Sequence, residues 1–206
     1  YFNLVSNNDD AKKTEMYKQQ FERENSKDTF STIDEYLSSL KIELKIIKND
    51  KTYIPRISQL SQKTNQFNLT TKRYTEIQIE NFIETDHVYA MFVNDKFGEN
   101  GLTGICIVKT DEHNSKLAVI DTFLMSCRII GRNIEFAFLN HIIQDLLLVG
   151  YESVIAEYIP TKKNAQVEDF YENAGLIFVL KREQNKEYSL NITNFEPKII
   201  DYIKIN

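Results

Sequence analysis

A short turn between an apolar strand and a long helix is the feature that most constrains the fold of this chain. Residues 116–125 are apolar enough for a central strand, and residues 134–148 repeat apolar side chains with the 3.6-residue period of a helix. Gly131 lies between them, and glycine readily adopts the backbone of a tight turn. The sequence therefore predicts a buried strand that leads, through Gly131, directly into a long helix.

The turn also carries two arginines, Arg128 and Arg132, which bear on what it could bind. The first turn of a helix exposes free backbone N–H groups at the positive end of the helix dipole, and it therefore attracts phosphate groups. Both arginines would strengthen this attraction, and the turn could then hold a pyrophosphate or a phosphopantetheine. The alternative is that Gly131 only permits a tight turn and that both arginines are solvated.

A second strand and a second helix follow the first pair. Residues 153–159 are typical of an apolar strand, and residues 164–175 are typical of a short helix that Gly175 ends. The order along the chain is strand, R-x-x-G-x-N, helix, strand and N-x5-F-Y-x3-G. This order resembles the acyl-coenzyme A binding half of the GNAT acyltransferase fold.

The GNAT resemblance implies an α/β (α+β) fold with a mixed, mostly antiparallel central sheet flanked by helices, here with an N-terminal helical extension. In that family the glycine-containing turn holds a pyrophosphate, the two strands splay to admit a pantetheine arm, and a tyrosine near the second helix often serves as general acid. Tyr171 matches that tyrosine, and Asn133 stands where the family usually has Gly or Ala. The residues predicted to bind phosphopantetheine or coenzyme A are Ser126, Arg128, Gly131, Arg132, Asn133 and Asn164.

A narrower resemblance rests on a polar run at residues 56–75 and on three further blocks, at residues 95–102, 125–128 and 158–164. These blocks are similar to FkbH-like proteins, the HAD-IIIC subfamily, in which a phosphatase-like HAD domain precedes a GNAT-like domain. The resemblance implies transfer of a glyceryl group, as a thioester, to an acyl carrier protein, or a role in a surface-glycan pathway. The HAD motif D-x-D-x-T is missing from the sequence, so we expect no phosphatase activity. Because the chain begins at Tyr1, we expect the HAD domain upstream in a longer natural protein.

The chain divides into a helical linker or extension at residues 1–40 and a GNAT-like domain at residues 41–206. The charged residues 9–25 and the capped residues 31–40 predict two helices in the first part. In the second part, strands are predicted at residues 41–48, 88–93, 101–109, 116–125, 153–159, 177–181 and 187–192, and helices at residues 54–63 and 75–84. Residues 198–205 fit a strand or a helix.

Three residues on or near the two predicted strand–helix pairs are candidates for catalysis. Cys127 lies beside Arg128 at the predicted helix N-terminus, where a thiolate would be favoured and could take an acyl group before passing it on. Alternatively Cys127 is a small buried apolar residue, as Cys106 is expected to be. Tyr171 could protonate a leaving thiolate or could be an ordinary core tyrosine. Asp121 is a possible base, and the alternative is a capping or ion-paired carboxylate.

The polar run contains neutral donors and acceptors that would suit a polyol or a carboxylate. Arg73 could hold the carboxylate or phosphate of a glycerate-like acyl group by a two-pronged contact, and the side-chain amides could bond its hydroxyls. The predicted substrate-binding residues are Asn65, Gln66, Asn68, Thr70 and Arg73. The alternative is a set of turn and capping residues that bond their own backbone.

Composition limits the possible partners. The formal net charge is −5 and the pI is about 5.4, so we expect no nucleic-acid partner. No apolar run approaches the roughly 18 residues of a membrane span, and no signal-peptide pattern occurs, so we expect no membrane partner and a cytoplasmic protein. The three histidines and two cysteines show no metal-ligand spacing, so we expect no metal.

Three functions from different classes follow from these patterns. The first is transfer of glyceryl or another small acyl group to or from the phosphopantetheine thiol of an acyl carrier protein. The second is a non-catalytic domain that docks the carrier protein for the upstream HAD domain. The third is an acetyl-coenzyme A dependent N-acyltransferase that acts on an amino-sugar or another amine. We rank them in that order, and the second stays close to the first because fold resemblance alone does not establish chemistry.

Overall fold

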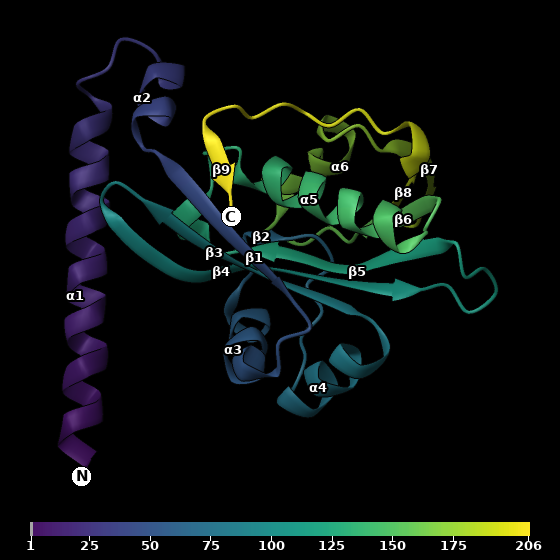
Figure 1. Cartoon of the computed structure of the whole chain (residues 1–206), viewed down its shortest axis with the longest axis horizontal. Helices are drawn as coiled ribbons and strands as arrows, with labels where there is room; N and C mark the ends of the chain where they lie inside the picture. The colour runs from purple at the N-terminus through teal and green to yellow at the C-terminus, as the bar shows by residue number, and fades with distance from the viewer. Residues whose placement is uncertain (1) are drawn as a thin grey trace.

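The computed structural model describes the backbone of residues 2–206 and the side chains from residue 14 onward. In this part of the chain, one mixed sheet carries the strands in the order β7-β8-β6-β5-β4-β3-β1-β9, with the short strand β2 paired to β5 (Figure 1). The strands are β1 Ile42–Lys48, β2 Phe67–Asn68, β3 His87–Asp95, β4 Gly98–Thr110, β5 Leu117–Met125, β6 Ser153–Tyr158, β7 Ile177–Arg182, β8 Asn185–Asn191 and β9 Ile203–Ile205. The β1·β9 and β5·β6 pairs are parallel, and the other pairs are antiparallel.

Helices cover both faces of the sheet. Figure 1 shows α5 and α6 on one face and α3 and α4 on the other. The helices are α1 Phe2–Lys27, α2 Ile33–Ser39, α3 Ile54–Lys63, α4 Glu76–Thr85, α5 Ile134–Val149 and α6 Phe170–Asn173, with 3-10 turns η1 Lys51–Tyr53, η2 Cys127–Ile129, η3 Ala165–Val167 and η4 Ile192–Asn194. The predicted fold class, a mostly antiparallel mixed sheet flanked by helices, is confirmed.

One predicted helix differs from the sequence-based expectation, and one alternative that the sequence left open is decided. The single helix predicted at residues 164–175 is two short helical pieces, η3 and α6. The two pieces are separated by turn residues 168–169, and the turn before them is closed by the side-chain oxygen of Asn164, which accepts the N–H of Thr161 at 2.7 Å. At residues 198–205, where a strand or a helix was expected, only the strand β9 forms.

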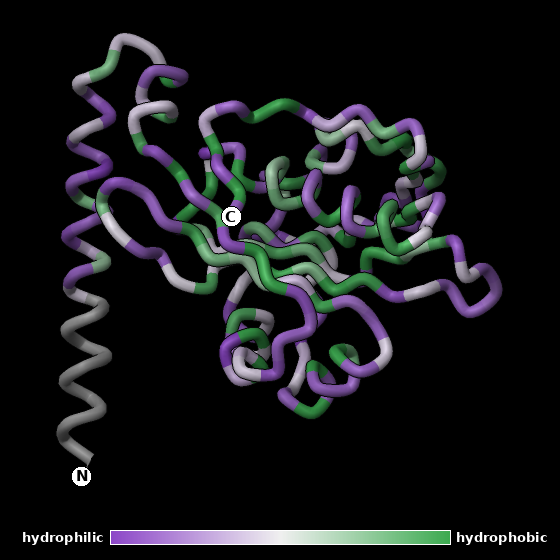
Figure 2. Tube along the Cα trace, viewed as in Figure 1, coloured by the Kyte–Doolittle hydropathy of each residue, from purple (hydrophilic) through white to green (hydrophobic). Residues whose placement is uncertain are grey.

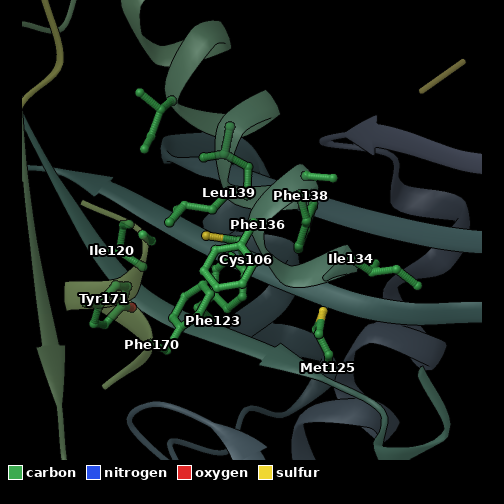
Figure 3. Packing of buried hydrophobic residues seen from close by; sticks show 14 of the residues in the cluster. Cys106, Ile120, Phe123, Met125, Ile134, Phe136, Phe138, Leu139, Phe170 and Tyr171 are labelled. Carbon is green, nitrogen blue, oxygen red and sulfur yellow. The ribbon is translucent and has the colours of Figure 1, made fainter. Parts of the chain in front are cut away.

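The main core lies between the sheet and α5. Aromatic rings from several elements meet there, and Figure 3 shows Phe123, Phe136 and Phe170 close together around Cys106. The ring centroids of Phe123 and Phe170 are 5.0 Å apart. Cys106 is fully buried, as predicted, and its thiol therefore acts as core packing. Figure 2 shows the hydrophobic residues concentrated in the central strands, whereas the described part of α1 is mostly hydrophilic.

Helix α1 is docked on the β3–β4 hairpin despite its hydrophilic sequence (Figure 1). Its Arg23 binds Asp95 of β3 with two hydrogen bonds, Nε to Oδ2 at 2.7 Å and Nη2 to Oδ1 at 2.9 Å. Gln19 packs so closely on the hairpin that a Cβ added to Gly98 would lie 2.4 Å from its Nε2. A buried, bidentate ion pair and a glycine contact therefore fix the helix to the sheet. Across residues 2–206, no helix has both the length and the hydropathy needed to traverse a bilayer.

Candidate functional site

The gap between β5 and β6 is filled by the chain itself. The two strands pair in parallel only where Leu117–Ile120 face Ser153–Ala156, and they separate beyond that point. Strand β2 lies in the space between them, with Phe67 opposite Met125 and Asn68 opposite Leu124 of β5. The strands do splay, as the resemblance implied, but the expected opening for a pantetheine arm is occupied in this structure. The accessible space lies just outside the gap.

A pocket of about 760 Å³ opens beside the end of β5. Three segments that are far apart in the sequence meet there: α3 with the residues after it, the start of η2, and the loop after β6. The lining residues are Arg56, Gln59, Leu60, Lys63, Thr64, Asn65, Gln66, Ser126, Cys127, Arg128, Lys162 and Lys163. Five of these residues are cationic, and among the described side chains none that lines the pocket is acidic. We call this space the basic pocket.

Cys127 presents the one thiol of the basic pocket. It is the first residue of η2, directly after β5, and its side chain is exposed. Backbone bonds fix this position: the N–H of Ser126 donates to the carbonyl of Thr103 at 2.7 Å, and the N–H of Ile130 donates to the carbonyl of Cys127 at 3.4 Å. The alternative of a buried apolar Cys127 is therefore wrong, and the thiol is placed where a ligand in the pocket can reach it.

Arg128, next to that thiol, is a cation without an anionic partner among the described side chains. One guanidinium nitrogen donates to the carbonyl of Asn100 at 3.1 Å, while Nε is buried without a hydrogen-bond partner. Burial, followed by repulsion from Arg56, lowers the pKa of Arg128 from its ordinary value. A bound anion would relieve both penalties, so the pocket is electrostatically suited to a phosphate or a carboxylate.

The turn at Gly131 adjoins the basic pocket but does not line it. Gly131 has a φ of +82°, which confirms the predicted tight turn, and a Cβ there would meet nothing within 4 Å. Asn133 also has a positive φ, +60°, and its side chain donates to the hydroxyl of Tyr202 at 2.7 Å instead of capping α5. The predicted binding of a phosphate by Gly131 and Asn133 remains a prediction.

Arg132 was expected either to bind phosphate or to be solvated, and the structure shows neither. Its guanidinium is buried, pairs with Asp95 at 3.0 Å and donates to the carbonyl of Arg128 at 2.8 Å. Burial of an arginine is costly unless a carboxylate compensates, and Asp95 supplies that charge. Arg132 therefore holds the turn against β3 and is not free for a ligand in this conformation.

Tyr171, predicted as a general acid, is a core residue. Its side chain is fully buried beside Phe170 (Figure 3) and also packs on Tyr188, and burial raises the pKa of its hydroxyl well above the ordinary value. The hydroxyl has no hydrogen-bond partner among the described groups. An acid must reach the atom that it protonates. The structure therefore contradicts the assignment of Tyr171 as a general acid. Tyr171 is an ordinary core tyrosine, which was the alternative.

Asp121, predicted as a base, is an ion-paired carboxylate. It is 6% exposed and pairs with Lys109 at 2.8 Å and Lys72 at 3.0 Å, and the hydroxyl of Tyr74 donates to its other oxygen. Burial by itself would raise the pKa of Asp121, but the bonds from Lys109, Tyr74 and Lys72 outweigh it, and the pKa is lowered. The structure contradicts the assignment of Asp121 as a base and supports the alternative of an ion-paired carboxylate, since Lys109, Lys72, Tyr74 and Thr122 already bind it.

Replacing Asp121 with asparagine is expected to lower the free energy of unfolding by about 2 kcal/mol at pH 7, because two lysines lose their partner. Because folding lowers the pKa of Asp121, its ionised carboxylate stabilises the folded state. This stabilisation is fully present above the pKa of the unfolded chain, about 4, and is lost as the pH falls through the pKa of the folded protein. Urea unfolding at pH 7 and at pH 3 should therefore show the two proteins converging at low pH. An equal difference at both pH values would contradict this account, and Glu112→Gln, an exposed loop carboxylate, is the control.

The predicted substrate-binding residues divide into two groups. Asn65 and Gln66 line the basic pocket. Asn68 is fully buried, donates to the carbonyl of Thr64 at 3.2 Å and accepts the N–H of Thr71 at 2.8 Å. The structure therefore contradicts a substrate-binding role for Asn68. Asn68 has the alternative role of a polar residue that bonds the backbone of its own segment.

Thr70 and Arg73 are corrected in the same way. The hydroxyl of Thr70, which is 3% exposed, donates to the carbonyl of Asp121 at 3.0 Å. Arg73 donates to the carbonyl of Ser61 at 2.9 Å, and also to the carbonyl of Gln62 and the side-chain oxygen of Asn65. These carbonyls belong to the last turn of α3, which lacks intrahelical donors. Arg73 is thus a helix-capping residue.

Asn164 and Ser126, both predicted to bind the cofactor, lie in different surroundings. Asn164 is fully buried and donates to the carbonyls of Asn68 at 2.9 Å and Ile159 at 3.0 Å, so it is corrected to a structural residue. Ser126 lines the basic pocket beside Cys127. Among the residues with described side chains, no three His, Cys, Asp or Glu gather as metal ligands would.

Sequence reasoning missed four cations of the basic pocket: Arg56, Lys63, Lys162 and Lys163. All of them lie inside or beside the blocks at residues 56–75 and 158–164 that carry the narrower resemblance. Each is an ordinary charged residue in its own segment. The only signal was that two separate blocks both contain lysine or arginine, and nothing in the sequence showed that these blocks meet.

Comparison with models of known protein families gives no match to the sequence, and no curated protein matches it. Solved structures do match. The ribosomal-protein-S18-alanine N-acetyltransferase from Escherichia coli is 16% identical, with a TM-score of 0.55 over 72% of this chain and 94% of that chain. The putative acetyltransferase yncA from Salmonella typhimurium, solved with its cofactor acetyl-CoA, is 12% identical, with a TM-score of 0.54 over 76% and 99% of the two chains.

The spermidine/spermine N-acetyltransferase SpeG from Vibrio cholerae, in mutant forms, is 11% identical to this chain. Its TM-score is 0.53 over 74% of this chain and 95% of that chain. The fold is therefore that of the GNAT acetyltransferases. At these identities the likeness concerns the fold alone, and the resemblance to FkbH-like proteins remains a prediction.

Proposed function

We propose that this domain transfers glyceryl or another small acyl group to or from the phosphopantetheine thiol of an acyl carrier protein, through a thioester on Cys127. The observation that carries the proposal is the exposed Cys127 thiol in a pocket with five cations. The phosphate of a phosphopantetheine arm is an anion that lysine and arginine bind well. The acyl group would come from the HAD domain predicted upstream.

The chemistry needs only thiol exchange. The Cys127 thiol gives its proton to water, its sulfur bonds to the carbonyl carbon of the incoming thioester, the bond from that carbon to the carrier sulfur breaks, and the departing thiolate takes a proton back from the solvent. The reverse of this step passes the acyl group from Cys127 to a second thiol. Cations around the carbonyl stabilise the negative charge that develops on its oxygen, and Arg128 is the nearest in sequence.

The test is direct detection of the intermediate. The domain is incubated with an acylated carrier protein, and its intact mass is measured before and after treatment with neutral hydroxylamine, which cleaves thioesters. We expect a hydroxylamine-sensitive increase equal to the acyl group, mapped by peptide analysis to Cys127. If neither an adduct nor a transferred acyl group is found with this domain, the transferase activity belongs elsewhere and the docking function is favoured.

Reversing the charge of Arg128 is expected to weaken binding of the carrier protein at least about tenfold, because Arg128 then repels the phosphate that it attracts now. Calorimetric titration of Arg128→Glu with the phosphopantetheinylated carrier measures the effect, and the carrier without its arm shows how much depends on the phosphate. Arg182→Glu is the matched control, since Arg182 is an exposed arginine of β7 that does not line the pocket. Equal losses in the two variants would contradict a specific contact.

A second candidate function, transfer from acetyl-coenzyme A to an amine, has one observation of its own. A smaller pocket of about 180 Å³ is lined by Glu157 and Glu187, together with Asp121 and the Lys72 that pairs with it, so two carboxylates are in excess. A protonated amine fits an acidic pocket, whereas the basic pocket would repel it. The named amine acetyltransferases among the structural neighbours support the same function. Turnover of acetyl-coenzyme A with amines, without any carrier protein, would favour this candidate over the first.

A further inference from the structure

We infer that residues 67–70, which we call the gap segment, are a built-in specificity element that keeps a pantetheine arm out of the gap between β5 and β6, so that a thioester is directed to the basic pocket. The first half of this inference concerns the fold and stands by itself. The second half rests on the proposed function, because it assumes that a thioester is the substrate.

The gap segment is bonded to β5 along its whole length. Phe67 and Asn68 pair with the end of β5. The N–H of Leu69 donates to the carbonyl of Phe123 at 3.1 Å, and the hydroxyl of Thr70 donates to the carbonyl of Asp121 at 3.0 Å. The gap segment thus runs antiparallel to β5 and takes up the hydrogen-bonding groups that this edge would otherwise offer to a ligand.

The other side of the gap segment is bonded to the chain that follows β6. The N–H of Ile159 donates to the carbonyl of Leu69 at 2.8 Å. Asn164 then donates to the carbonyls of Asn68 and Ile159 at 2.9 and 3.0 Å. A single buried side chain therefore ties the gap segment to the chain that follows β6. An amide of pantetheine would have to compete for backbone groups that are already paired on both sides.

Packing holds the gap segment as firmly as hydrogen bonding does. The exposed fractions of Phe67, Asn68, Leu69 and Thr70 are 3%, 0%, 0% and 3%. The ring of Phe67 meets that of Phe170 edge-on, with centroids 5.4 Å apart. To admit a ligand, the chain would have to expose two large apolar side chains and break the bonds on both edges at once. Displacing the gap segment by a ligand is therefore far less favourable than binding the ligand in an empty gap.

The gap segment also separates the basic pocket from the interior of the sheet. Residues 64–66, directly before it, line the pocket together with Ser126 and Cys127. Phe67 pairs with Met125, the last residue of β5, and Ser126 and Cys127 follow directly after Met125. A thioester that enters from solvent therefore meets Cys127 first and finds the route into the gap closed behind it. Specificity would then favour a thiol that is presented from outside, at the end of an arm.

Amide hydrogen exchange tests whether the gap stays closed. The exchange rates of the Leu69 and Ile159 amides are measured by NMR with and without 5 mM coenzyme A, a concentration on the order of a weak fragment affinity. We expect both rates to change less than about twofold. A tenfold or larger acceleration at Leu69 would show that the arm displaces the gap segment and would overturn the inference.

Loosening the gap segment supplies the positive control. In Asn164→Ala the amide of Leu69 should exchange at least about tenfold faster than in the wild type, because the tie between the gap segment and the chain after β6 is gone. Asn140→Ala is the matched variant, since Asn140 donates to the carbonyl of Lys198 on the surface, and Leu69 should be unaffected. Equal protection of Leu69 in all three proteins would mean that Asn164 does not hold the gap segment and would overturn that part of the inference.

The two proposals fail separately. If no acyl adduct forms on Cys127 but Leu69 stays protected, the closed gap stands and the proposed function falls. If the adduct forms while coenzyme A accelerates exchange at Leu69, the proposed function stands and the closed gap falls.

Discussion

Replacement of Cys127 with alanine is expected to lower acyl transfer by about a thousandfold or more, because no other described side chain of the basic pocket can form a thioester. Transfer between carrier proteins is measured as the initial rate of appearance of the acylated acceptor. Cys127→Ser should be nearly as inactive, since a serine hydroxyl needs an adjacent base, and no histidine or carboxylate lines the pocket in the described part of the chain.

Cys106→Ala is the control for the removal of a thiol as such. Cys106 is fully buried in the core, so this variant should lose about 1 kcal/mol of stability and keep its rate per folded molecule within a few-fold. Iodoacetamide should label Cys127 and spare Cys106 in the native protein. If Cys127→Ala retained more than about a tenth of the wild-type rate, the carrier would be docked here and acylated elsewhere, or the acyl group would pass directly between thiols.

Most of the sheet and the long helix were predictable because each carries a strong periodic signal over many residues. Strand β5 and helix α5 were identified with boundaries within two residues, and Gly131 marked the turn between them. Strand β2 left no such signal, since it has only two residues. Hydrophobic alternation cannot be recognised in so short a segment.

The polarity of the gap segment was also misleading. Asn68 and Thr70 look like ligand-binding residues in the sequence, but the groups that they bond include a carbonyl of Asp121, about fifty positions away. Buried polar side chains need partners, and a distant backbone carbonyl satisfies that need as well as a substrate would. Which of the two partners a polar residue has is decided by topology, and a single sequence does not contain that information.

The candidate site was predictable in part for a similar reason. Cys127 and Arg128 were singled out because they lie at a recognisable joint between a strand and a helix. The lysines at positions 162 and 163 reach the same pocket only because β6 runs parallel to β5 and ends at the same edge of the sheet. Arg132 was misjudged because its partner Asp95 lies 37 positions earlier, on another strand. The charge of Arg132 was evident from the sequence, whereas its buried partner was not.

Asp95→Asn is expected to be the most destabilising of these substitutions, with a loss of about 3–5 kcal/mol in the free energy of unfolding. The carboxylate of Asp95 is fully buried and bonds two buried arginines, Arg23 at 2.7 Å and Arg132 at 3.0 Å. Asparagine keeps the shape but removes the charge that compensates both guanidinium groups. Urea unfolding of the two proteins measures the change, and Glu99→Gln, an exposed carboxylate on the same hairpin, should shift the midpoint very little.

The part of the structure that Asp95→Asn destabilises is as informative as the change in the free energy of unfolding. Arg23 anchors α1, and Arg132 anchors the turn through the carbonyl of Arg128, so Asp95→Asn should loosen the N-terminal helix and the wall of the basic pocket together. Limited proteolysis of Asp95→Asn should cut first within α1. The same variant should bind the carrier protein more weakly, even under conditions in which the variant is fully folded. Loss of α1 protection with unchanged carrier affinity would mean that Arg132 keeps its place without Asp95. A total loss below about 1 kcal/mol would instead mean that water compensates the arginines and that the cluster is not buried in solution.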